Sequence, residues 1–286
     1  MTRPSWTRGL ALACAIAACT RDGSGRDVSA AEMILDSASA SLERGDNARA
    51  IAAYDRAIAL DSGISAAYRG RGVAHRNVGR LDLAVRDYDA AIRLDSTMAG
   101  TWNSRGFALQ LMERYDASIG DFDRALGIDP AYAQALKSRG RSRFYLGHFE
   151  AAAADLGEGL KSDSTNLYLP IWIHMAASRA GREDTTRLAG QVARIDLAGW
   201  PGPVASFYLG RITAEQFAAA AENPDSAVRA NQRCAVAFYL GEYLLWQPAP
   251  RPGEARTRLQ EAVATCPRQF SEYLGAKADL QRLSAP

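Results

Sequence analysis

Two successive stretches of the chain decide its fold: SAAYRGRGVAHRNVGRLDLAVRDYDAAIRLDSTM at residues 65–98 and AGTWNSRGFALQLMERYDASIGDFDRALGIDPAY at residues 99–132. When the two are aligned end to end, small, aromatic and acidic residues fall at the same positions. The shared columns are Ala84 with Ser118, Tyr88 with Phe122, Ala91 with Ala125 and Asp95 with Asp129. A repeat of about 34 residues is typical of paired antiparallel helices that stack on their neighbours.

The same period extends beyond these two stretches and defines four units, residues 31–64, 65–98, 99–132 and 133–166. A turn column continues through the chain as Gly45, Gly79, Glu113, Gly147 and Gly181, with Glu113 as its departure from glycine. We therefore expect each unit to contain a first helix, a turn at this column and a second helix. The predicted fold class is all-α.

Small residues mark the places where two helices of a unit should cross closely. In the second unit these are Gly72, Ala84 and Ala91, and the ring of Tyr88 would fill the space beside them. This order of residues resembles the tetratricopeptide repeat (TPR), and Pro130 in the third unit keeps the proline that ends the family's pattern. The resemblance implies a TPR array, an α-solenoid of helical hairpins wound as a right-handed superhelix.

The repeat pattern weakens after the fourth unit. Residues 167–230 are expected to form a degenerate helical region, because Pro170 interrupts the first-helix pattern and Trp200-Pro201-Gly202-Pro203 is a strong turn signal. A helix start is predicted at Thr213-Ala214-Glu215-Gln216. Residues 231–286 are expected to form a last TPR-like hairpin and a helix that caps the open end of the array.

The N-terminal segment, residues 1–18, has the pattern of an export signal, since two arginines precede an apolar stretch too short to span a bilayer. Its end, Ile16-Ala17-Ala18-Cys19, resembles the lipobox of bacterial lipoproteins. That resemblance implies lipidation of Cys19, with palmitate among the acyl chains, and an outer-membrane anchor facing the periplasm. Residues 19–28 would form a flexible tether. An ordinary signal peptide followed by a chance cysteine is the alternative.

Composition limits the classes of function. Hydrophobic residues make up 48% of the chain and charged residues 23%, which is ordinary for a soluble protein. Without residues 1–18 the chain has 32 basic and 32 acidic residues, and this neutrality argues against non-specific nucleic-acid binding. The three histidines, His75, His148 and His174, lie far apart and in no metal-ligand or nucleophile spacing. We therefore expect no enzyme, no metal and no cofactor.

Arginine and aspartate recur together inside the repeats. An aspartate follows each arginine after 16 residues in the pairs Arg71 and Asp87, Arg105 and Asp121, and Arg139 and Asp155. The first unit lacks both members of the pair. Their joint presence or absence predicts arginine–carboxylate pairs between helices. An arginine ladder that captures anions is the functional alternative.

Cys234 and Cys266 lie near the two ends of the last hairpin, Cys234 at the start of its first helix and Cys266 at the end of its second. Antiparallel helices bring a start and an end to the same edge, so a disulfide between them is predicted. An oxidising periplasm would permit this bond. Two buried, reduced cysteines are the alternative.

First helices of TPR arrays line a concave groove, and the resemblance implies which positions are exposed there. This partner-binding groove would be lined by Arg69, Arg76, Asn77, Asn103, Phe107, Gln110, Lys137, Arg141 and Phe144. The set mixes cations, amides and aromatic rings and contains no acid. Such a surface favours an extended segment or helix that carries carboxylates and an apolar anchor.

The lipobox, the repeats, the Trp200-to-Pro203 turn and the segment Phe238-Tyr239-Leu240-Gly241 together resemble the NlpI-like outer-membrane lipoproteins. That resemblance implies a non-catalytic scaffold that joins periplasmic cell-wall hydrolases and a protease. A structural lipoprotein of a pilus or outer-membrane machine is the alternative, as is a hydrolase pocket within residues 167–230. The partners would be other proteins, and an incomplete first unit could offer an edge for a homodimer.

Overall fold

The computed structural model describes residues 28–163, 166–182 and 184–284, and all regular structure within them is helical. The predicted all-α fold is confirmed. Cys19 and the rest of the expected signal and tether lie outside the described residues, except for Val28. The helices are α1 (Val28–Glu43), α2 (Asn47–Leu60), α3 (Ser65–Asn77), α4 (Leu81–Leu94), α5 (Ala99–Leu111), α6 (Tyr115–Ile128), α7 (Ala133–Tyr145), α8 (Phe149–Leu160), α9 (Tyr168–Arg179), α10 (Thr185–Val192), α11 (Gly202–Tyr208), α12 (Ala214–Ala219), α13 (Ser226–Trp246), α14 (Pro252–Thr265) and α15 (Ser271–Ser284).

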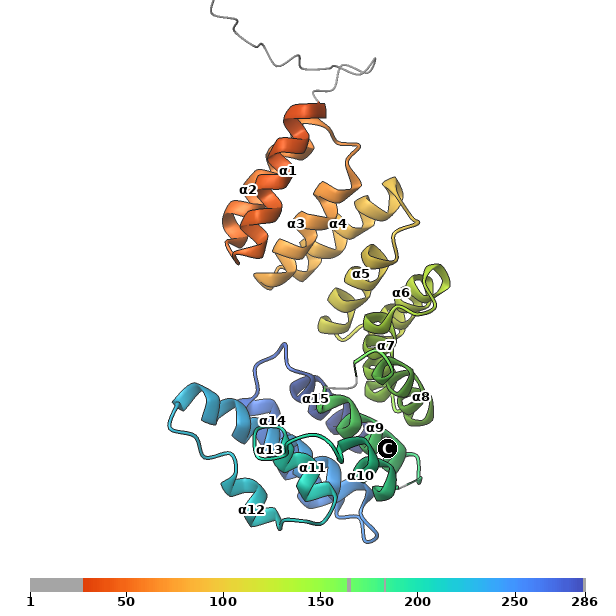
Figure 1. The fold of residues 1–286 in the computed structure, drawn as a ribbon, viewed down its shortest axis with the longest axis vertical. Helices are drawn as coiled ribbons and strands as arrows, with labels where there is room; N and C mark the ends of the chain where they lie inside the picture. The colour runs from red at the N-terminus through yellow and green to blue at the C-terminus, as the bar shows by residue number, and fades with distance from the viewer. Residues whose placement is uncertain (1–27, 164–165, 183, 285–286) are drawn as a thin grey trace, which may run out of the picture.

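Helices α1 to α8 form four antiparallel hairpins stacked in chain order, and α9 to α15 gather beneath them in a second group (Figure 1). Each hairpin packs on the next through its second helix, while the first helices α1, α3, α5 and α7 also contact one another in sequence. The first helices therefore lie on the inner side of the curved array, as expected for an α-solenoid. None of the described helices combines the length and apolar character needed to cross a bilayer.

The residues of the turn column share a left-handed backbone conformation. The φ angle is +77° at Gly45, +75° at Gly79, +84° at Gly147 and +74° at Gly181, a region that glycine enters without a Cβ clash. Glu113 adopts the same conformation, with φ of +61°. Its carboxylate accepts a hydrogen bond of 2.5 Å from Lys277 Nζ on α15. The departure from glycine thus lies where the C-terminal helix contacts the array.

Close helix crossings account for the small residues inside each unit. A Cβ added to Gly72 would lie 2.8 Å from Tyr88 Cε1, and one added to Gly106 would lie 2.8 Å from Phe122 Cε1. These distances are too short for an unstrained carbon–carbon contact. The predicted packing of Tyr88 beside Gly72 is confirmed, and Phe122 packs beside Gly106 in the same way.

The arginine–aspartate prediction is also confirmed, and each arginine holds two carboxylates. Arg105 Nε and Nη2 donate to the two carboxylate oxygens of Asp121 at 2.8 and 2.6 Å, and Arg105 Nη1 donates to Asp89 Oδ1 at 2.6 Å. Arg71 bonds Asp87 and Asp55 in the same way, and Arg139 bonds Asp155 and Asp123. The second aspartate precedes its arginine by 16 residues and belongs to the preceding unit. The pairs therefore join neighbouring units, and these guanidinium groups are already occupied by the protein's own carboxylates.

The C-terminal group has a continuous core that includes parts of α6 to α9 as well as α10 to α15. Helix α9 is buried on most of its surface, from Leu169 to Ala176. Pro170, which interrupts the repeat pattern, lies in the first turn of α9, where a backbone N–H has no intrahelical partner, so the helix accommodates it. His174 is also part of the helix and packs against the rings of Tyr208 and Trp246.

Of two other expectations about helix starts, one is confirmed and one is wrong. The capping box at Thr213 and Gln216 is confirmed by both of its hydrogen bonds. Helix α13 begins at Ser226, where the Asp225 carboxylate caps it, so Cys234 lies inside this helix and not at its start. Its sulfur is bonded to Cys266, which follows the end of α14. Helix α1 begins at Val28.

A buried cluster of charged side chains connects three helices of the C-terminal group. Arg179 Nη1 of α9 donates to Glu242 Oε2 of α13 and to Asp279 Oδ1 of α15, both at 2.9 Å. Arg282 also donates to Asp279. Burial raises the pKa of Glu242 well above its usual value, and the neighbouring Asp279 raises it further. Burial alone would raise the pKa of Asp279, but the neighbouring Glu242 and the two arginines lower it. Of these two buried carboxyl groups, Glu242 therefore has the raised pKa and Asp279 the lowered one.

This cluster predicts a specific pH dependence of stability. Because the folded protein raises the pKa of Glu242, the stabilisation that protonated Glu242 gives is complete below about pH 4.5. It is lost as the pH rises through the pKa of Glu242 in the folded protein. Replacing Glu242 with glutamine keeps a hydrogen-bond donor beside Asp279 and removes the titration. As the pH rises above about 4.5, the free energy of unfolding should therefore fall less steeply in Glu242→Gln than in wild type, by up to about 1.4 kcal/mol per pH unit. Urea unfolding of both proteins at several pH values measures this difference, and parallel pH profiles would contradict it.

Candidate functional site

The concave surface is formed by the first helices of the repeats, and part of the predicted groove lies there. Arg69 on α3 and Asn103 and Phe107 on α5 are partly exposed. The guanidinium of Arg76 lies over the ring of Phe107, 5.4 Å from its centroid. Asn77 is exposed at the end of α3 and donates to Asn47 Oδ1 at 3.1 Å. These side chains offer a ring, a cation and amides on one surface.

Two residues predicted to line the groove are buried instead. Gln110 is 1% exposed, and its Nε2 donates to Ser138 O at 3.0 Å and to Ser142 Oγ at 2.7 Å. Phe144 is fully buried, and its ring packs edge-on against Trp172 at 5.1 Å. Both residues lie near the C-terminal ends of their helices. There the first helix of the next hairpin covers them: α7 covers Gln110 of α5, and α9 covers Phe144 of α7. Both side chains therefore contribute to packing between helices.

Helix α7 carries the last two predicted groove residues, Lys137 and Arg141, four residues apart on one helix face. Lys137 Nζ forms an ion pair of 3.1 Å with Asp163 Oδ2. Arg141 is partly buried and has no carboxylate partner among the described residues. The two arginines beside it in sequence, Arg139 and Arg143, both hold Asp155. Arg141 is therefore the arginine of α7 that remains available to an external anion.

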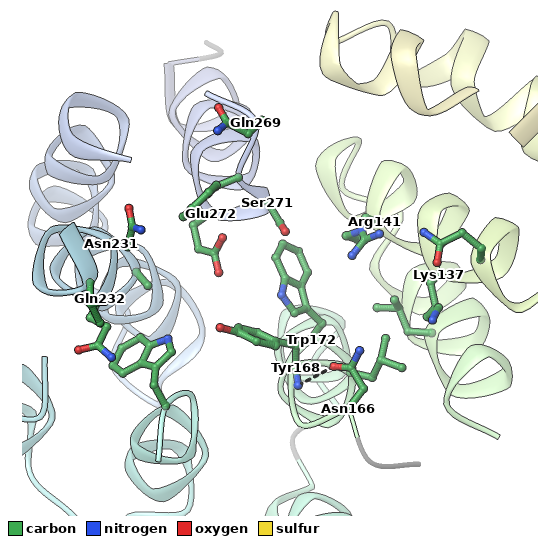
Figure 2. Close-up of a pocket in the computed structure, with 17 residues that line it drawn as sticks. Lys137, Arg141, Asn166, Tyr168, Trp172, Asn231, Gln232, Gln269, Ser271 and Glu272 are labelled. Carbon is green, nitrogen blue, oxygen red and sulfur yellow. Dashed lines mark hydrogen bonds between the residues drawn. The ribbon is translucent and has the colours of Figure 1, made fainter. Parts of the chain in front are cut away.

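Lys137 and Arg141 also line a cavity of about 580 Å³ between the last repeat and the C-terminal group, which we call the end pocket (Figure 2). Its walls come from α7, α9, α13 and the N-terminal end of α15. The cavity lies within the range of about 300–1,000 Å³ that is typical of ligand sites. Its principal lining residues are Gln134, Lys137, Arg141, Tyr168, Trp172, Trp200, Asn231, Gln232, Gln269 and Glu272.

Glu272 is the acidic residue among those that line the end pocket, and it is nearly buried. Its Oε1 accepts a hydrogen bond of 3.1 Å from the hydroxyl of Tyr239. Burial raises the pKa of Glu272 above its usual value, although Tyr239 and Arg141 act in the opposite direction. Figure 2 shows the Glu272 carboxyl directed into the cavity from one side and the Arg141 guanidinium from another. A neutral carboxyl at this place can donate a hydrogen bond to a ligand.

The end pocket was not predicted from the sequence. Its residues come from helices separated by more than 100 positions, and only their packing in the fold brings them together. Lys137 and Arg141 were identified because they recur at a repeat position, whereas Asn231, Gln269 and Glu272 belong to no repeat. Among the described residues there is no group of three or more His, Cys, Asp or Glu side chains placed to hold a metal ion.

Comparison with known proteins agrees with this architecture. A profile of the tetratricopeptide repeat family matches residues 35–99. No curated protein matches the chain.

Solved structures with the same fold extend the likeness to most of the array and beyond it. A TPR protein from Parabacteroides merdae aligns with 88% of this chain and 99% of its own, with 15% identity and a TM-score of 0.58. The MamA protein aligns with 60% of this chain and 98% of its own, with 20% identity and a TM-score of 0.53. MamA from Desulfovibrio magneticus RS-1 aligns with 57% of this chain and 92% of its own, with 15% identity and a TM-score of 0.52. At these identities the likeness shows a shared TPR fold.

Proposed function

We propose that this chain is a non-catalytic scaffold that binds a protein partner along the concave surface of its TPR array. TPR proteins generally mediate protein–protein interactions, and stacked helical repeats offer extended concave surfaces for this purpose. The observation that carries the proposal is the set of side chains left open on α3, α5 and α7. This set combines the ring of Phe107, the cations of Arg69 and Arg141 and the amide of Asn103. None of the residues predicted to line the groove is acidic.

The partner is expected to present an extended or helical segment with carboxylates and at least one apolar side chain. A cationic groove attracts such a segment, while the ring of Phe107 provides an apolar contact for its anchor. The repeated arginines Arg71, Arg105 and Arg139 do not contribute to this attraction, because each guanidinium is already paired with aspartates of the protein.

We further propose that the scaffold is tethered to the outer membrane through lipidated Cys19 and faces the periplasm. The support is the sequence resemblance to lipoproteins and, more specifically, to NlpI-like adaptors of cell-wall hydrolases and proteases. Mass spectrometry of the mature N-terminus tests the anchor. A diacylated or triacylated Cys19 is expected, and an unmodified N-terminus at another residue would overturn it.

Substitution of groove residues should weaken partner capture without unfolding the array. Lys137 is a poor choice for charge reversal because it pairs with Asp163, so Arg69→Glu combined with Phe107→Ala is the better variant. Loss of one cation and of the ring that contacts the partner's apolar side chain should reduce affinity by about 100-fold or more, since such interface residues each contribute about 1–2 kcal/mol or more. Pull-down of the partner, with circular dichroism to verify helicity, measures the effect. Arg86→Glu on the exposed face of α4 is the matched control.

Crosslinking in cells identifies the partner and tests the concave surface in one experiment. A photoreactive amino acid at position 107 lies on α5 inside the groove, and one at position 86 lies on α4 outside it. Mass spectrometry should then recover cell-wall hydrolases or proteases from position 107 and not from position 86. Recovery of pilus or outer-membrane assembly components would favour the structural role. Equal crosslinking from both positions would contradict binding along the groove.

A further inference from the structure

The end pocket contains an arginine that the protein itself leaves without an anion. Arg139 and Arg143 on the same helix hold Asp155, and Arg71 and Arg105 hold two aspartates each. Arg141 alone among these five has no carboxylate at ion-pair distance within the described residues, although it is partly buried. A partly desolvated guanidinium binds a carboxylate more strongly than an exposed one and can do so through two parallel hydrogen bonds.

The surroundings of Arg141 favour a peptide over an inorganic ion. Neutral amides at Gln134, Asn231 and Gln232 can each donate to and accept from a peptide backbone. Trp172 and Trp200 give the same cavity an apolar wall. An inorganic anion would leave this apolar wall and most of the amides without a contact.

Glu272 does not oppose a bound anion when it is protonated. Its carboxyl group is nearly buried, and the hydroxyl of Tyr239 on α13 donates to it. Three further titratable groups on neighbouring helices interact electrostatically with Glu272. They are Arg141 and Tyr145 on α7 and Tyr168 on α9. Burial favours the neutral form of Glu272, which can donate its proton to a ligand oxygen.

We propose that the end pocket binds one side-chain carboxylate, together with an adjacent apolar side chain, from an acidic peptide segment, and that Arg141 holds this carboxylate. The inference rests on the proposed scaffold function and adds the place where the partner's acid is recognised. Lys137 and Arg141 belong both to the concave face of α7 and to the pocket. A segment that lies along the groove can therefore insert a side chain into the pocket without leaving the inner surface.

Binding of a set of peptides to the full-length protein tests this proposal. Each probe is a fluorescent ten-residue peptide with an amidated C-terminus and one glutamate between two apolar residues, and each has a matched peptide with glutamine in place of glutamate. Wild type should bind the best glutamate peptides about tenfold or more tightly than their glutamine versions. Arg141→Gln should lose this preference, whereas Arg86→Gln on the exposed face of α4 should keep it. Equal affinity of wild type for both versions, or binding of neither, would overturn the proposal.

Two further measurements separate this site from related explanations. Peptides with a free C-terminus and no acidic side chain should bind no better than the glutamine peptides, and tight binding of these would assign the pocket to chain ends instead. The preference for glutamate should also decline as the pH rises and Glu272 loses its proton, and Glu272→Gln should flatten that decline. A purely structural role of Glu272 would change stability and leave the pH profile of the preference unaltered.

The experiments can contradict the proposed scaffold function and the proposed end-pocket site independently of each other. If Arg69→Glu with Phe107→Ala abolishes capture of the cellular partner while Arg141→Gln leaves both capture and peptide preference intact, the groove is correct and the pocket assignment is wrong. If wild type shows the peptide preference but position 107 crosslinks nothing, the pocket binds acidic segments and the scaffold function along the groove is wrong.

Discussion

Arg105→Met is expected to lower the free energy of unfolding by about 3–5 kcal/mol. The substitution removes the guanidinium that donates two hydrogen bonds to Asp121 and a third to Asp89 in the preceding unit. Asp121 is 5% exposed, so its charge would remain buried without a partner, which is costlier than loss of the pair as a whole. Urea unfolding followed by circular dichroism gives the change.

The double variant Arg105→Met with Asp121→Leu separates this cause from simple loss of contact. It replaces both partners with apolar groups of similar size and should recover most of the lost stability. Arg124→Met on α6 removes an exposed arginine that has no ion pair among the described residues and should change stability by less than about 0.5 kcal/mol. A double variant as unstable as Arg105→Met would contradict the argument.

Loss of the Cys234–Cys266 bond should have the second large effect. The two cysteines are 32 residues apart in sequence, and the bond joins the interior of α13 to the residue after α14. On the chain-entropy account, closing a loop of this length contributes about 3–4 kcal/mol by restricting the unfolded chain. Cys234→Ser with Cys266→Ser should therefore lower the midpoint of thermal unfolding, and the same shift should follow reduction of wild type.

Thiol chemistry provides the control for this second prediction. In wild-type protein unfolded without a reductant, Cys234 and Cys266 should not react with a thiol reagent, and both should react after reduction. Full labelling before reduction would mean that the two cysteines are buried thiols, and reduction would then leave the unfolding midpoint unchanged. The buried positions of both sulfurs make unfolding necessary before either result is interpreted.

The regular part of the molecule was predictable because each feature repeats. The glycine–aromatic crossings of Gly72 with Tyr88 and Gly106 with Phe122 recur at a fixed spacing, and so do the arginine–aspartate pairs. Asp89 was overlooked as the second partner of Arg105, although it too recurs every 34 residues with Asp55 and Asp123. A search for aspartates 16 residues before each arginine would have found it.

The errors arose where a residue's environment is supplied by another part of the chain. Gln110 and Phe144 occupy repeat positions that are exposed when one unit is considered alone, yet neighbouring helices cover both. Cys234 is expected at the start of a helix, yet α13 begins at Ser226, where the Asp225 carboxylate caps it. Burial and helix boundaries both depend on contacts that a local pattern does not contain.

The sequence by itself determined the stack of helical hairpins, the turn column and the carboxylate partners of three arginines, since local spacing specifies which helix faces meet. Only the tertiary structure decided that α15 packs against α7, and that α13 faces them across the end pocket around Arg141. It also placed Glu242 and Asp279 beside Arg179, and Glu113 beside Lys277. These groups come from distant segments without a common period, so their proximity results from burial of the shared apolar core and not from any spacing in the chain.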